Sequence, residues 1–116
     1  MAHDYLQRIQ RDFPHIRPYE ENDFEWWNEG SKLLENGKLV EAETKFKMLV
    51  LSQPHHPDGF EGLARVYIQM KRKEEANFFI DLAIEKAKTA IASGEMDTEA
   101  MDIYQTQKTI IDKLPE

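Results

Sequence analysis

The chain has 116 residues, the length of one domain with a modest core, and its 41% hydrophobic and 32% charged residues are typical of a folded globular protein. The net charge of −7 is shared evenly between the two halves of the chain, so no basic segment suggests a nucleic-acid partner. Cysteine is absent, which excludes disulfides, thiolate metal ligands and thiol nucleophiles.

The start of the chain, MAHDYLQRIQ, has no basic stretch followed by an apolar run, so we expect no signal peptide. No segment approaches 18 consecutive apolar residues, and we therefore expect neither a membrane-spanning helix nor a membrane partner. Together these features predict a cytoplasmic protein.

The first predicted element is a short helix over residues 4–12, which places Leu6, Ile9 and Phe13 on one side. A helix of this length is marginal in isolation, so we expect it to lie on another surface. The stretch PHIRPYEEN that follows contains two prolines and predicts an extended linker. We assign residues 1–22 to this N-terminal helix and linker.

Four longer helices are expected at about 24–35, 39–52, 58–70 and 73–92, because apolar residues recur at helical spacing and β-strand alternation is absent. Asp23 and Asp58 are suited to cap the first and third of them. Asn36-Gly37 supplies the left-handed turn after the first, and Pro54 ends the second. The predicted fold class is all-α.

The last predicted helix spans residues 97–113. Met101, Tyr104 and Ile111 form one apolar stripe together with Leu114. Stacked helical repeats require a terminal helix with a polar outer face, and we expect residues 97–114 to form such a C-terminal capping helix.

The sequence contains an internal repeat with a period of 34 residues. At this displacement large residues align with large ones and small residues with small ones, without a change of register. The aligned pairs include Trp26 and Phe60, Gly30 and Ala64, Leu33 and Tyr67, and Ala42 and Ala76. The segment therefore contains two copies of one helical hairpin.

The two copies resemble the tetratricopeptide repeat family, whose pattern combines an aromatic residue, several small residues, a tyrosine and a closing proline. The first copy, residues 23–56, matches the pattern at Trp26, Gly30, Ala42, Phe46 and Pro54. The second copy, residues 57–92, matches it at Leu63, Tyr67, Ala76 and Ala83. Glu29 and Lys88 depart from the pattern, since a leucine and a second proline are usual there.

The resemblance implies an α-solenoid of antiparallel helix hairpins, with a concave groove lined by the first helix of each hairpin. The groove residues that it implies are Phe24, Trp27, Ser31, Leu34 and Glu35 from the first copy, and Asp58, Glu61, Arg65, Ile68 and Gln69 from the second. Two possibilities remain open for Phe24 and Trp27: the N-terminal segment covers them, or they stay exposed for a partner.

One subtype of the family holds the C-terminal carboxylate of chaperones through lysine and asparagine residues of the groove. Trp27 and Ser31 stand at those places here, and Arg65 is the only cation that the groove offers. We therefore expect a ligand with apolar anchors rather than a chaperone tail.

Motifs for catalysis and for cofactor binding are absent: the sequence has no GxSxG, P-loop, GxGxxG or HExxH. His55, His56 and Asp58 lie in an expected turn, where adjacent histidines do not converge on one ion. We expect no catalytic residue, no metal site and no cofactor.

These observations predict a protein–protein interaction module, an adaptor or chaperone-like protein that binds a peptide or helical segment of a partner. The alternative is a structural subunit that self-associates as a homo-oligomer, or docks into a larger assembly, through the same apolar surface. An enzyme or metal-binding protein is a third possibility, for which the sequence supplies no motif.

Overall fold

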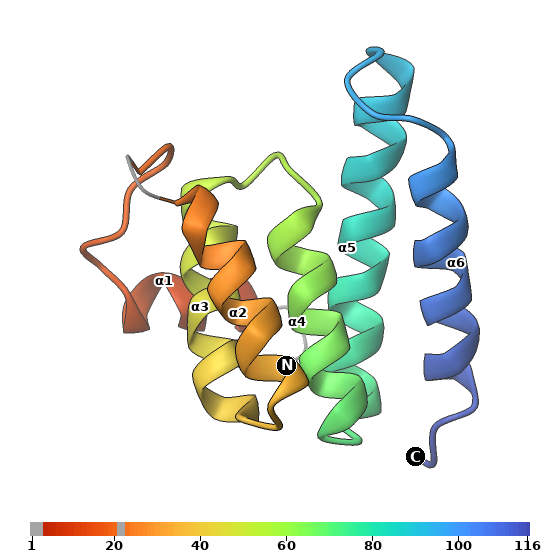
Figure 1. Ribbon diagram of the computed structural model, residues 1–116, viewed down its shortest axis with the longest axis horizontal. Helices are drawn as coiled ribbons and strands as arrows, with labels where there is room; N and C mark the ends of the chain where they lie inside the picture. Colours follow the sequence, from red (N-terminus) through yellow and green to blue (C-terminus); the bar gives the residue numbers. More distant parts are fainter. Residues whose placement is uncertain (1–3, 21–22) are drawn as a thin grey trace.

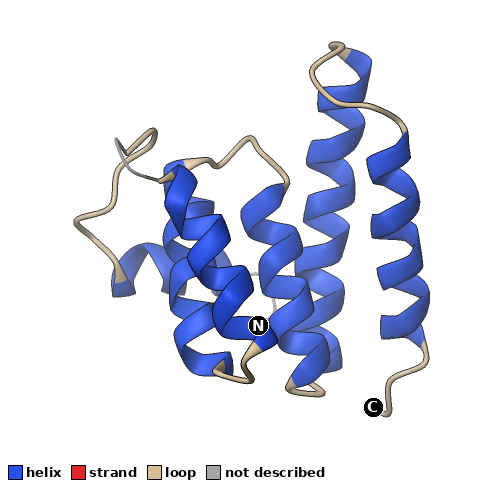
Figure 2. Ribbon diagram, in the orientation of Figure 1, coloured by secondary structure: helices blue, strands red, loops and turns tan. Residues whose placement is uncertain are grey.

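The computed structural model describes residues 4–20 and 23–116, and these residues form only helices and loops (Figure 2). The six helices of the described residues are α1 (Tyr5–Asp12), α2 (Phe24–Glu35), α3 (Leu39–Ser52), α4 (Asp58–Gln69), α5 (Lys73–Ala92) and α6 (Glu99–Asp112). The predicted all-α class is confirmed. The bounds of α2 to α5 agree with the expected spans to within one residue.

The backbone itself repeats with the 34-residue period. Both ends of α4 lie 34 residues after the ends of α2, and α5 begins 34 residues after α3. The connecting turns match as well, because Gly37 and Lys71 both have a positive φ. In each turn the residue that follows the positive-φ residue donates its N–H to a carbonyl oxygen of the preceding helix. The distance between the nitrogen and the oxygen is 2.9 Å in both turns. This bond closes the end of the helix, so the two hairpins are built in the same way.

The hairpins differ at the end of their second helices. Pro54 follows α3 closely and prevents its continuation past Ser52. Lys88 stands at the matching place in the second hairpin, and α5 continues to Ala92 before the chain turns at Gly94, whose φ is +82°. The extra length of α5 gives α6 a surface to pack on (Figure 1).

The core lies where α2, α3, α4 and α5 meet. The ring of Phe46 is fully buried against Gly30 of α2 and Gly62 of α4. A Cβ added to Gly30 would lie 2.8 Å from this ring and one added to Gly62 would lie 2.3 Å from it, so an alanine at either position would force the ring or a helix to move. Ala42 and Ala76, which are aligned by the repeat, are both fully buried.

The N-terminal helix packs on the side of the bundle that α3 and α5 form. Ile9 is buried, and the ring of Tyr5 lies 5.1 Å from that of Phe78 and 5.9 Å from that of Phe79 on α5. The short helix thus has the supporting surface that its length requires. With α1 in this position, Trp27 of α2 is still 36% exposed.

Ser52 fixes the linker after α1 to the first hairpin. Its carbonyl accepts the N–H of Tyr19 at 2.6 Å, and its hydroxyl accepts the N–H of Glu20 at 2.7 Å. The same hydroxyl donates to the carboxylate of Asp23. Asp23 was expected to cap α2, but its side chain makes this bond and no cap bond. Asp23 nevertheless occupies the predicted N-cap position of α2. The expected cap at Asp58 is wrong, because Asp58 is already the first residue of α4.

The C-terminal helix, α6, packs against α5 and α4. Tyr104 and Ile111 are buried, and Met101 and Leu114 are partly buried, as the predicted stripe requires. Lys108 holds the outer edge of the contact through Asp81 of α5, at 3.0 Å. Within the described part of the chain, no helix has both the length and the apolar character needed to cross a bilayer.

Candidate functional site

Three helices contribute to one surface that carries four of the ten sequence-predicted groove residues. α2 lies beside α4 (Figure 1), and α4 is joined to α6 by the pair Glu61 and Gln107. We call this surface the α2–α4–α6 face. Its defining residues are Phe24, Trp27 and Ser31 of α2, Arg65 of α4, and Ile103, Gln107 and Ile110 of α6.

Arg65 joins the helices of this face. Its guanidinium carbon lies 5.8 Å from the ring centroid of Trp27, within the range of a cation–π contact. Its Nη2 donates to the hydroxyl of Ser31 at 3.3 Å, and its Nε lies 3.0 Å from a carboxylate oxygen of Glu61. Arg65 of α4 thereby contacts both Trp27 and Ser31 of α2. Glu61, one helical turn earlier on α4, in turn fixes the position of the Arg65 guanidinium.

Glu61 lies beneath the contact between α4 and α6 rather than on the surface. Only 7% of the residue is exposed, and its carboxylate accepts a hydrogen bond from Nε2 of Gln107. Burial raises the pKa of the Glu61 carboxyl, and Arg65 and Gln107 oppose this shift. The sequence placed Glu61 among groove residues open to a ligand. That prediction is wrong, because α6 covers the carboxylate.

Four large apolar side chains are exposed on the α2–α4–α6 face. The exposed fractions are 65% for Phe24, 36% for Trp27, 59% for Ile103 and 46% for Ile110. Phe24 and Trp27 are one helical turn apart on the side of α2 that meets Arg65. Exposed apolar groups that gather on one face mark interaction surfaces.

Ile103 and Ile110 were not among the sequence-predicted site residues. They lie four residues before and three residues after Gln107, so they share the side of α6 that faces α4. The sequence did contain a signal for them. They are seven residues apart and stand beside the buried pair Tyr104 and Ile111, which leaves α6 with a second apolar stripe.

The remaining predicted residues are placed as follows. Leu34 is only 4% exposed and packs in the core, so its assignment to the groove is wrong. The reason is that α2 contacts α3 and α4 at once, and the side carrying Gly30 and Leu34 lies between them. Ile68 is partly buried against the core. Gln69 is exposed one turn after Arg65.

The two histidines of the turn before α4 do not form a metal site with Asp58. Nδ1 of His56 lies 3.4 Å from a carboxylate oxygen of Asp58, and both side chains are substantially exposed. Among residues 4–20 and 23–116, no group of three or more histidine, aspartate or glutamate side chains is arranged to hold a metal ion.

No protein-family model, curated protein or solved structure matches this chain.

Proposed function

We propose that this chain is a protein-interaction module of the tetratricopeptide type, and that the α2–α4–α6 face binds an apolar peptide or helical segment of another protein. The carrying observation is the exposure of Phe24 and Trp27 on α2 and of Ile103 and Ile110 on α6, the two helices that contact α4. The family assignment is supported by the 34-residue displacement of helices and turns. The adaptor or chaperone-like role and the cytoplasmic location are parts of the same proposal.

Trp27 is suited to anchor such a partner. Tryptophan is enriched among the residues that dominate binding energies, and a side chain already held in place loses less conformational entropy on binding. Arg65 holds the indole ring of Trp27 from the side of α4 while more than a third of the residue stays accessible. We therefore expect Trp27 to contribute more to affinity than any other residue of the face.

The charge pattern of the face favours apolar anchors over an acidic tail. The Arg65 guanidinium already contacts Glu61, Ser31 and Trp27. A carboxylate of a ligand would compete with Glu61 for this cation. The apolar side chains of α2 and of α6 flank this polar centre, so a bound segment would place apolar residues on both sides of it.

The alternative is that the same face joins two copies of this chain. Light scattering of the purified chain separates the two functions. We expect a monomer whose mass is independent of concentration. A dimer that Trp27→Ala converts to a monomer would favour self-association instead.

The proposed function is tested by affinity capture with the full chain. The bait variants are the parent, Trp27→Ala and Phe24→Ala, with Val40→Ala as the matched control because Val40 is 69% exposed on α3. We expect a specific protein that the parent and Val40→Ala retain and that both aromatic variants lose. Equal recovery with all four baits would contradict the proposal. Phe24→Ala removes little packing, so its loss of binding cannot be ascribed to unfolding.

A further inference from the structure

A hollow lies between the N-terminal segment and the hairpins, away from the α2–α4–α6 face. It has a volume of about 420 Å³ and a largely apolar wall. Its lining includes Leu6 and Phe13 of the N-terminal segment, Val50 of α3, Phe60 of α4, and Leu82 and Lys86 of α5. Small-molecule sites in proteins commonly have volumes of about 300–1,000 Å³.

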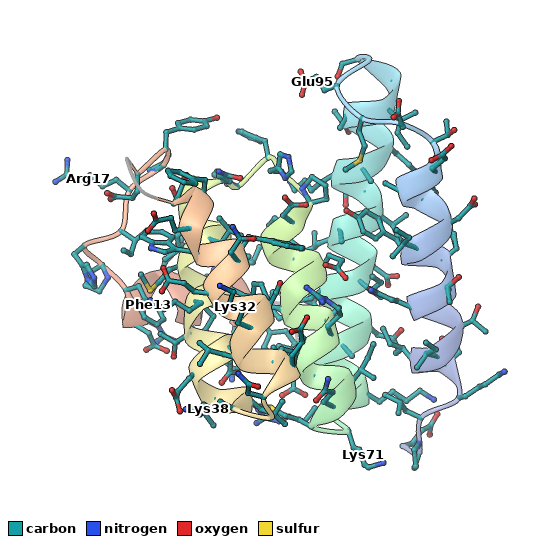
Figure 3. The ribbon with its side chains drawn as sticks, viewed as in Figure 1. Phe13, Arg17, Lys32, Lys38, Lys71 and Glu95 are labelled. Atoms are coloured by element: carbon teal, nitrogen blue, oxygen red, sulfur yellow. The ribbon has the colours of Figure 1, made fainter. Side chains whose placement is uncertain are left out.

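The burial of the lining residues separates a floor from a rim. Val50 and Phe60 are 3% exposed and form the floor. Gln10 and His55 also line the hollow and are exposed, so they belong to the rim. Figure 3 shows Phe13 at the end of α1 beside the hairpin, and Arg17 on the outer side of the linker, directed away from the helices. The apolar part of a ligand would therefore lie toward Val50 and Phe60, with polar groups near the opening.

Lys86 gives this hollow an unusual charge for so acidic a chain. Among the described residues that line it there is no aspartate or glutamate, although the chain has 22 acidic and 15 basic residues. Nζ of Lys86 lies 5.8 Å from the ring centroid of Phe60 on the floor. Among the described residues, no carboxylate lies within ion-pair distance of Nζ of Lys86. Lys86 thus places an ammonium group that no described carboxylate neutralises at this hollow.

We propose that the hollow binds a small apolar molecule that carries a carboxylate, of the class of a medium-chain fatty acid. The hydrocarbon part packs against Leu6, Phe13 and Leu82 above the floor, and the carboxylate pairs with Lys86. Since Leu6 and Phe13 belong to the N-terminal segment, the ligand also fastens this segment to the hairpins. The site is separate from the surface assigned to a protein partner.

The test is a titration of the full chain with decanoate and with decanamide, its neutral analogue, followed by methyl NMR. We expect decanoate to shift the methyl signals of Leu6, Val50 and Leu82, and to bind about fivefold or more tightly than decanamide, the effect of roughly 1 kcal/mol from one ion pair. Lys86→Gln should remove this preference and leave the affinity for decanamide unchanged. Lys88→Gln is the matched control, because Lys88 is an exposed lysine of the same helix that does not line the hollow.

Three results would overturn the proposal. One is the absence of shifts at these methyl groups with decanoate at about 1 mM. That result would favour an apolar side chain of a protein partner as the occupant of the hollow. Another is an unchanged preference for decanoate in Lys86→Gln. The third is a set of shifts confined to the α2–α4–α6 face. Lys86 is partly exposed, and circular dichroism verifies that its substitution leaves the helices intact.

Discussion

Lys71 occupies in the second hairpin the position that Gly37 occupies in the first. Both residues have a left-handed backbone, with φ of 61° for Lys71 and 77° for Gly37. This conformation costs a residue with a Cβ roughly 1–2 kcal/mol, whereas glycine adopts it freely. The repeated backbone therefore imposes a strain on the second turn that the first turn avoids.

Replacement of Lys71 by glycine should stabilise the chain. The gain is about 0.5–1 kcal/mol, because relief of the left-handed strain exceeds the extra conformational entropy of glycine in the unfolded chain. Urea denaturation measures the change in the free energy of unfolding. Gly37→Ala is the matched comparison at the equivalent turn, and it should lower stability. A Lys71→Gly variant less stable than the parent would contradict this interpretation of the turn.

Gly62→Ala should destabilise the fold even though alanine is the better helix former. The new Cβ would lie 2.3 Å from the Phe46 ring, so the ring or α4 has to move. Overpacking of this kind costs about 1–3 kcal/mol, more than the roughly 0.5–1 kcal/mol gained in helix propensity.

A double-mutant cycle with Phe46→Leu tests the cause. The smaller side chain makes room for the Cβ, so the loss caused by Gly62→Ala should shrink in the Phe46→Leu background. Thermal or urea unfolding of the four proteins gives the coupling. Strictly additive losses, or a Gly62→Ala protein more stable than the parent, would show that the two residues do not press on each other.

Glu61 should make the fold less stable as the pH rises above its ordinary pKa. Burial raises the pKa of this carboxyl above 4.5, with Asp58 adding to the shift and Arg65 and Gln107 opposing it. The folded chain therefore holds the proton to a higher pH than the unfolded chain does. The resulting stabilisation is present below 4.5 and is lost as the pH rises through the raised value.

Glu61→Gln isolates this effect, because glutamine stays neutral. The free energy of unfolding of the parent minus that of Glu61→Gln should fall as the pH is raised from below 4.5 to neutral. Urea denaturation across this interval measures the difference. A difference that rises with pH would mean that Arg65 outweighs burial and lowers the pKa instead.

The sequence predicted the helix bounds well because local signals fix them. Gly37 and Pro54 end helices through backbone constraints that act at the residue itself. The 34-residue spacing was visible because matching positions of the two hairpins meet similar neighbours, as Ala42 and Ala76 do. These features need no knowledge of distant contacts.

The burial of individual site residues was predicted less well because it depends on distant partners. Glu61 is covered by Gln107, 46 residues further along the chain, on a helix whose placement the repeat does not specify. Leu34 is buried because α2 packs against both α3 and α4. The helical pattern of the sequence shows two adjacent apolar sides on α2 but does not say which of them a second neighbouring helix covers.

The most direct test of the proposed function is the affinity of the captured partner for variants on two helices of the face. Isothermal titration would compare Trp27→Ala on α2 and Ile103→Ala on α6 with the control Val40→Ala on α3. We predict that Trp27→Ala weakens binding by about 30-fold or more, that Ile103→Ala weakens it by about fivefold, and that Val40→Ala leaves it within about twofold. A partner that binds Trp27→Ala as tightly as the parent would contradict the assignment of the α2–α4–α6 face.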